Sequence, residues 1–218
     1  ERFPAITGEW PLKGGELTVS SPFGGAVFLV APGRGPGREI TATVTGAVEA
    51  PLFVRGKTSN AEWQASRVTP GPWAELAGQK VILTVPSAVV RDLNDPEALM
   101  AYWDEMMTHC YTLYAAPLRA RPERFCVDRQ ISAGYMHSGY PIMTGDDVAK
   151  KFVTLETLRG DDGNTCWGFY HEMGHNFQEP EWTWNGCGEV TNNLFSLYGC
   201  EKLNRVYDEK TRTYPRAH

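Results

Sequence analysis

The stretch WGFYHEMGHN at residues 167–176 contains the pattern H-E-x-x-H. On a helix, residues four apart lie on one face, so His171 and His175 can bind one cation together. Glu172 lies one position round the same helix and then points at a site beside that cation. We therefore expect a helix over about Thr165–Asn176 that carries two metal ligands and a carboxylate next to them.

A third ligand is expected from the segment that follows. Glu189 comes after thirteen intervening residues, 176–188, which is enough chain to turn and begin a second helix, expected over Glu189–Leu203. Two histidines and a glutamate suit zinc, which binds them tetrahedrally and leaves its fourth position to water. A helix N-terminus also favours an acidic residue through its dipole, but beside H-E-x-x-H we predict that Glu189 is a ligand. Cys187 is an alternative thiolate ligand, although a buried free cysteine is its commoner fate.

Other residues near these helices are candidates for supporting contacts. Metal ligands need neighbours that fix their orientation, and Asn176, Asn192 and Asn193 can do this or act as ordinary caps and surface amides. Trp182 and Trp184 lie in the loop between the two helices. Their flat faces can pack against a sugar ring or cover the hydrophobic core.

The first part of the chain has the composition of a β region. From Gly15 to Val85 it is rich in β-branched residues, and Pro, Gly and Ser interrupt it at short intervals, as in antiparallel sheets with tight turns. A small β-sandwich or curled sheet is expected. The predicted strands are Glu16–Ser20, Ala26–Val30, Glu39–Val44, Leu52–Arg55 and Val81–Val85.

The composition changes at Pro86–Pro96, after which helices are expected. Asp95 can cap a helix that begins with Pro96. This helix should run to about Ala116 with one buried face, because apolar residues recur at three- and four-residue spacing. Extended chain is expected over Asp128–Ile142 and a short strand over Lys151–Thr154. The fold class is therefore α+β, with a β-rich region at 1–86 packed on a mostly helical zinc-binding region at 87–218.

Composition also excludes some classes of function. The net charge is -5, so no basic surface for nucleic acid is expected. The longest apolar run, about Ala26–Ala31, is far shorter than the roughly 20 residues of a membrane-spanning helix. The five cysteines are odd in number and form no C-x-x-C pair. At least one thiol should be free, and this leaves an intracellular location open.

Four stretches together resemble one family. WGFYHEMGHN (167–176), GCGEVTNN (186–193), QISAGYMHSGYPIM (130–143) and SPFGG (21–25) are similar to the enhancin-like gluzincins and to their vertebrate relatives, the TRPM channel-associated factors. The resemblance covers about Leu12–Leu203. It implies a zinc-dependent endopeptidase, secreted or on the cell surface, that cuts glycoproteins such as O-glycosylated mucins. Catalytic domains of the family carry further helices after the third ligand, so the region 87–218 is expected to be truncated at its C-terminus.

The motif and the chemistry of zinc peptidases predict roles for individual residues. Glu172 would be the general base that takes a proton from the attacking water and passes it to the leaving amine. In zinc peptidases a Tyr or His near the metal often stabilises the oxyanion of the tetrahedral intermediate, and Tyr140 and His137 are candidates for this role. Otherwise they are a packed aromatic residue and a histidine with ordinary hydrogen-bond partners. The alternative is a non-catalytic regulatory or partner-binding protein like the channel-associated factors. The presence of His171, Glu172, His175 and Glu189 argues against it, because a pure scaffold has no need of a general base.

Overall fold

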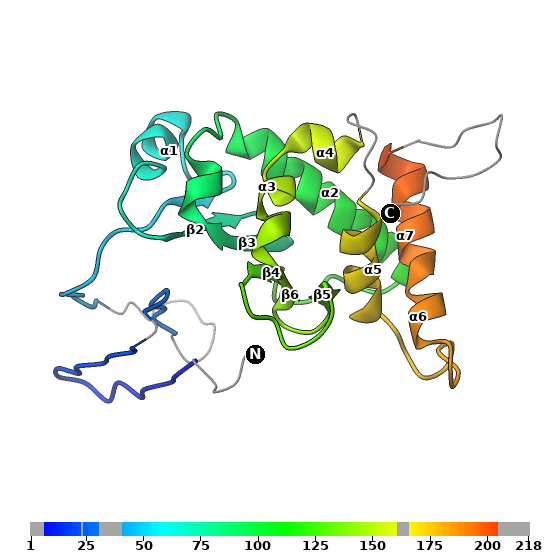
Figure 1. Cartoon of the computed structure of the whole chain (residues 1–218), viewed down its shortest axis with the longest axis horizontal. Coiled ribbons are helices and arrows are strands. Elements are labelled where there is room, and N and C mark those ends of the chain that lie inside the picture. The colour runs from blue at the N-terminus through cyan, green and yellow to red at the C-terminus, as the bar shows by residue number, and fades with distance from the viewer. Residues whose placement is uncertain (1–6, 23, 31–40, 161–165, 205–218) are drawn as a thin grey trace.

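The computed structural model describes residues 7–22, 24–30, 41–160 and 166–204 (Figure 1). The strands are β1 (Leu52–Val54), β2 (Trp73–Ala77), β3 (Val81–Pro86), β4 (Glu123–Val127), β5 (Met136–His137) and β6 (Ile142–Thr144). The α-helices are α1 (Asn60–Ser66), α2 (Pro96–Tyr114), α3 (Ala149–Phe152), α4 (Leu155–Arg159), α5 (Trp167–His175), α6 (Gly188–Thr191) and α7 (Asn193–Gly199). Short 3-10 turns cover Ser87–Val90 and Asp146–Val148, and a π turn covers Cys200–Asn204.

The strands form one six-stranded sheet in the order β1-β2-β3-β4-β6-β5. The predicted combination of strands with a helical region is confirmed, but the strand directions are mixed and not antiparallel throughout. β2 pairs antiparallel with β3 and β5 with β6, whereas β1/β2, β3/β4 and β4/β6 are parallel. A parallel pair needs a long crossover, and α2 supplies it between β3 and β4. Strands from both sides of the predicted boundary at residue 86 share this sheet, and the two-region division stays a prediction.

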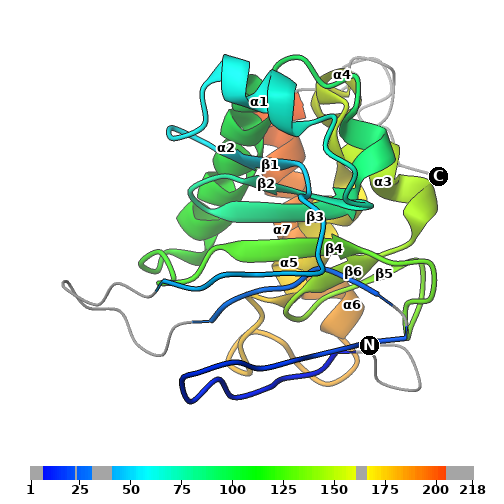
Figure 2. The same cartoon turned by 90° about the vertical axis from the view of Figure 1, so that its left-hand side faces the viewer.

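The N-terminal segment differs from the prediction. Strands predicted at Leu52–Arg55 and Val81–Val85 correspond to β1 and β3, but Glu16–Ser20 and Ala26–Val30 are wrong, because these residues belong to no strand. Glu39–Val44 lies partly outside the described residues, and its described part, 41–44, is not a strand either. The side chains at 7–20, 24–30 and 41–50 are exposed, and Figure 2 shows the first of these stretches, residues 7–20, below the sheet. β-branched residues favour a strand only when neighbouring strands pack against them.

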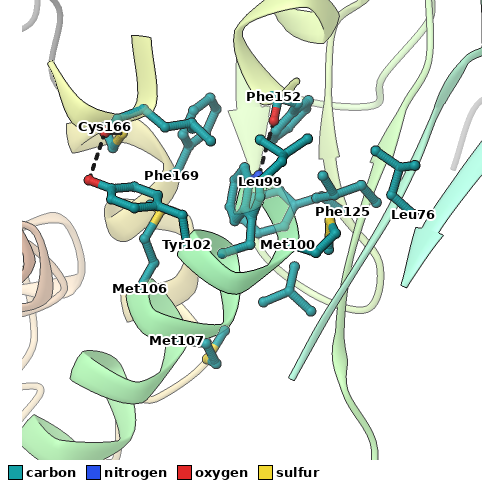
Figure 3. Packing of buried hydrophobic residues seen from close by; sticks show 14 of the residues in the cluster. Leu76, Leu99, Met100, Tyr102, Met106, Met107, Phe125, Phe152, Cys166 and Phe169 are labelled. Carbon is teal, nitrogen blue, oxygen red and sulfur yellow. Dashed lines mark hydrogen bonds between the residues drawn. The ribbon is translucent and has the colours of Figure 1, made fainter. Parts of the chain in front are cut away.

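The long helix α2 forms the centre of the core. It begins as predicted, with the Asp95 carboxylate accepting a hydrogen bond from the Ala98 N–H at 2.9 Å. The indole ring of Trp103 is fully buried, and its N–H donates to the Phe152 carbonyl at 3.0 Å. Its ring centroid lies 5.1–5.5 Å from those of three aromatic residues on β4, α3 and α5: Phe125, Phe152 and Phe169. Figure 3 shows these three side chains packed beside α2. The predicted apolar face of this helix is therefore core.

A further prediction fails at Lys151–Thr154, which was expected to be a strand. Residues 149–152 form helix α3 instead. Val148, Ala149 and Phe152 are buried, and their three- and four-residue spacing is helical. Among the described residues, none of the helices is long and apolar enough to cross a membrane.

Helices α5 and α7 lie against each other beside α2 (Figure 1), and two glycines permit this contact. A Cβ on Gly174 would lie 2.5 Å from the Asn192 carbonyl oxygen, and one on Gly199 would lie 2.3 Å from the Tyr170 ring. Neither position can hold a larger side chain without movement. The glycine inside H-E-x-x-H thus lets α5 approach the segment that carries Glu189.

Candidate metal centre

The three predicted ligands come together at the contact between α5 and α6. The Glu189 carboxylate oxygen Oε2 lies 3.1 Å from His171 Nε2 and 3.4 Å from His175 Nε2. One candidate ligand atom from each residue can be chosen so that all three lie within 4.8 Å of one another. The histidine side chains are largely buried, at 21% and 17% exposure, whereas that of Glu189 is 76% exposed. The cluster is therefore open to solvent on the glutamate side.

The separations of the Glu189 oxygen from the two histidine nitrogens fit a zinc site. In a tetrahedral zinc site with bonds of about 2.0–2.1 Å, two ligand atoms lie about 3.3–3.4 Å apart. The two measured separations between Glu189 and the histidines are close to this value. Two imidazole nitrogens and one carboxylate oxygen are also a ligand set of catalytic zinc sites.

The outer nitrogen of each histidine ring has its own partner. His171 Nδ1 lies 2.8 Å from Asn193 Oδ1, and the Asn193 amide donates to the Glu189 carbonyl at 2.8 Å. His175 Nδ1 lies 2.8 Å from Gln178 Oε1. Gln178 was not predicted, although its position three residues after His175 places it within reach of that ring.

Asn192, the third predicted amide, is fully buried and touches the inner nitrogen of a histidine. Its Nδ2 lies 2.9 Å from His175 Nε2. Its own oxygen is buried and has no hydrogen-bond partner in the described structure. Asn192 therefore contacts the candidate site directly, on the side of α5 that faces α7.

Glu172 is buried beside the cluster, with 7% of its surface exposed. Burial raises the pKa of its carboxyl above the usual value, and the Glu189 carboxylate adds to this effect. His171, His175 and His137 oppose it. Glu172 is thus within electrostatic reach of all three predicted ligands and of His137 on β5.

The loop that follows His137 at the end of β5, and that carries Tyr140, is attached to the end of α5 by Asn176. The Asn176 side chain accepts from the Gly139 N–H at 2.9 Å and donates to the Gly139 carbonyl at 3.0 Å. Tyr140 packs under Arg121, whose guanidinium carbon lies 3.3 Å from the ring centroid. Asn176 therefore positions this loop, and the predicted oxyanion roles of Tyr140 and His137 stay predictions.

The loop between the ligand helices holds two tryptophans in different surroundings. Trp182 is partly buried against the core, with its ring centroid 6.1 Å from that of Phe195, whereas Trp184 is 66% exposed. Of the two, Trp184 is free to meet a ligand. Cys187 does not belong to the cluster of candidate ligands, and all five cysteines are free thiols.

Comparison with protein families gives one match that covers most of the chain. Residues 46–217 match the model described as peptidase M60, enhancin and enhancin-like. A TRPM8 channel-associated factor homolog from Xenopus laevis is 40% identical over 200 residues, which are 90% of this chain and 22% of the relative. The chain thus spans about a fifth of the length of the curated relatives that it matches.

Solved structures share the fold. A conserved protein from Bacillus anthracis, described as functionally unknown, is 28% identical with a TM-score of 0.62 over 70% of this chain and 34% of its own. The M60 catalytic domain of ZmpC from Clostridium perfringens was solved in complex with the sialyl T antigen. It is 19% identical with a TM-score of 0.57 over 74% of this chain and 34% of its own. The mixed α/β arrangement is therefore that of M60 catalytic domains.

Proposed function

Because the chain belongs to the peptidase M60, enhancin and enhancin-like family, we propose that it is a zinc-dependent endopeptidase. Its substrates on this proposal are glycoproteins such as O-glycosylated mucins. One observation carries the proposal. The Glu189 carboxylate oxygen lies from each of two imidazole nitrogens at about the separation of a tetrahedral zinc site, the three residues offer ligand atoms within 4.8 Å of one another, and a buried carboxylate lies next to them.

The roles of the chain's own residues follow from their positions. His171, His175 and Glu189 would hold the metal, which when bound supplies Lewis-acid chemistry that activates water and polarises a carbonyl. The Glu172 carboxylate would accept the proton of the attacking water and pass it to the leaving amine. Its placement on the same helix as both histidines supports this role.

Support for a glycoprotein substrate is independent of the metal cluster. A related M60 catalytic domain was solved with the sialyl T antigen. In this chain the exposed indole of Trp184, in the loop between the two ligand helices, offers a flat face on which a sugar ring can pack. His137, within electrostatic reach of Glu172, and Tyr140 on the loop that follows it are the proposed donors to the oxyanion.

A second candidate function rests on the names of the relatives. The homologs that are about 40% identical are TRPM8 channel-associated factors, which favours a regulatory protein that acts through a partner. If the protein is such a regulator, replacing Glu172 would leave its regulatory function unchanged.

The deciding experiment measures metal content and cleavage together. Zinc per purified chain is determined by elemental analysis, and an O-glycosylated mucin and a non-glycosylated protein are digested in parallel. We expect about one zinc per chain, cleavage of the mucin alone, and loss of cleavage in Glu172→Gln. Cleavage of both proteins would contradict the proposed preference for glycoprotein substrates. Zinc binding without cleavage would favour the regulatory candidate.

A further inference from the structure

The orientation of the Asn193 amide follows from its neighbours. Its Oδ1 lies 3.1 Å from the indole nitrogen of Trp167 and 2.8 Å from His171 Nδ1. An indole nitrogen can only donate, so the atom that faces it must be the amide oxygen. On its other side, Nδ2 donates to the Glu189 carbonyl at 2.8 Å, and a carbonyl can only accept. His171 Nδ1 must therefore carry a proton and donate it to Asn193.

The Gln178 amide is oriented in the same way. Its Nε2 donates to the Gly188 carbonyl at 2.6 Å, so its Oε1 is the atom that faces His175 Nδ1 at 2.8 Å. His175 Nδ1 must also carry a proton. The Asn192 amide nitrogen, 2.9 Å from His175 Nε2, agrees with this tautomer, because it needs a lone pair on that nitrogen.

In these tautomers, three hydrogen-bond acceptors lie close together: the two Nε2 atoms and the Glu189 carboxylate. With both protons on Nδ1, the neutral rings present lone pairs at Nε2, and Glu189 Oε2 lies 3.1 Å from one and 3.4 Å from the other. Neither ring in this state has a proton to share with the carboxylate. Three acceptors this close repel one another unless a donor or a cation offsets the repulsion. The Asn192 N–H is such a donor at His175 Nε2, and a cation bound by all three would offset it fully.

The same two amides also attach the helix of the third ligand. The Asn193 amide donates a hydrogen bond to the carbonyl of Glu189 itself. The Gln178 amide donates to the Gly188 carbonyl and, at 2.8 Å, to the Thr191 hydroxyl. Each amide therefore links the outer nitrogen of one histidine to α6. A carboxamide can do both at once, because its oxygen accepts while its NH2 group donates.

We propose that Gln178 and Asn193 are positioning residues that hold His175 and His171 in the Nδ1–H tautomer and fix Glu189 opposite the Nε2 atoms of both rings. This inference rests on the proposed zinc site. Outer partners of this kind typically change metal affinity by 10–100-fold. The effect expected here is a loss of about that size when either amide is removed.

The test reads the tautomer and the metal affinity separately. Ring 15N chemical shifts of the metal-free protein, recorded at about pH 8.5 where a free imidazole is neutral, separate a protonated nitrogen from one with a lone pair. In the wild type, both rings should carry the proton on Nδ1. In Gln178→Ala, His175 should gain an Nε2–H population, and zinc affinity in a chelator competition should fall about 10–100-fold. The tautomer of His171 should stay unchanged.

Two further variants sharpen the test. Gln178→Glu keeps an acceptor for Nδ1–H, so the tautomer of His175 should be retained. The matched control is Gln64→Ala on α1, which removes an exposed amide bonded to Asn60 at 3.2 Å and should change neither the tautomer nor the zinc affinity.

The outcomes distinguish this inference from the proposed function. If the wild type binds no zinc, the proposed function fails. If it binds zinc but His175 carries its proton on Nε2, the positioning inference fails alone, and this measurement needs no variant. Unchanged zinc affinity in Gln178→Ala would overturn it too. So would a weaker affinity with an unchanged tautomer, because that result means a general loss of structure.

Discussion

Replacement of Gly174 by alanine tests whether the close contact of α5 with the chain between α6 and α7 positions the metal ligands. The added Cβ would lie 2.5 Å from the Asn192 carbonyl oxygen and 3.1 Å from the Phe195 ring. Ordinary contact begins at 3.4 Å, so the two segments must separate by about 0.9 Å, the difference between 3.4 and 2.5. Neither neighbour is the end of a flexible side chain, and the backbone must move.

The expected magnitude combines two opposing effects. Overpacking of this kind destabilises the folded protein by about 1–3 kcal/mol. Replacing a helical glycine by alanine stabilises it by up to about 1 kcal/mol. The central values, about 2 and about 1 kcal/mol, leave a net loss of about 1 kcal/mol, which should lower the melting temperature of the metal-free protein by about 2–4 °C. Metal sites tolerate ligand distances within about 0.2 Å, so a shift of Glu189 with α6 should lower zinc affinity by at least about tenfold.

The matched control is Gly168→Ala on the same helix. There the new Cβ meets only the terminal methyl of Met136, at 2.4 Å, and this flexible end can turn away. Thermal melts and chelator competition are measured on both variants. The reasoning is refuted if Gly174→Ala matches Gly168→Ala in both stability and zinc affinity.

Three further predictions concern single side chains. Glu189→Ala should weaken zinc binding sharply in a chelator competition and Glu189→Gln less, because the first removes a ligand and the second only its charge. Glu172→Gln should keep zinc and fold but lose most peptidase activity, since an amide cannot accept the proton of water. Asp104→Asn should destabilise the protein by about 1.5–3 kcal/mol in urea. The buried Asp104 carboxylate accepts from the Gln79 and Lys80 N–H groups at 2.8 and 2.7 Å, and an amide offers only one acceptor.

Each of these outcomes has a clear opposite. If Glu189 only favours a helix N-terminus, its removal costs about 0.3–1 kcal/mol and leaves zinc affinity unchanged. Activity within a few-fold of the wild type in Glu172→Gln would mean that another group takes the proton. An unchanged urea midpoint for Asp104→Asn would mean that the turn at residues 78–80 does not depend on that carboxylate.

Several parts of the fold could be predicted because their signals are local. The start of α2 follows from Asp95 and Pro96, and the buried face of that helix follows from apolar spacing. A local signal for α1 was available too, since Ser59 and Glu62 form a capping box. The strands predicted at Glu16–Ser20 and Ala26–Val30 are wrong because β-branched residues become a strand only beside a partner strand.

The sequence by itself determined which chemistry the site can support. The spacing of His171, Glu172 and His175 places two imidazoles and a carboxylate on one helix wherever that helix lies, because four residues make about one turn. It also indicated Glu189 as the third ligand, since the intervening chain is long enough to return.

Only the tertiary structure decided how these groups meet. Gly174 sets the distance between α5 and the chain that follows α6, and this is a contact between segments about twenty residues apart. The partner of His175 Nδ1 is Gln178, which depends on the position of the Gly188 carbonyl. Such contacts depend on how two helices pack, and no local pattern along the chain encodes that arrangement.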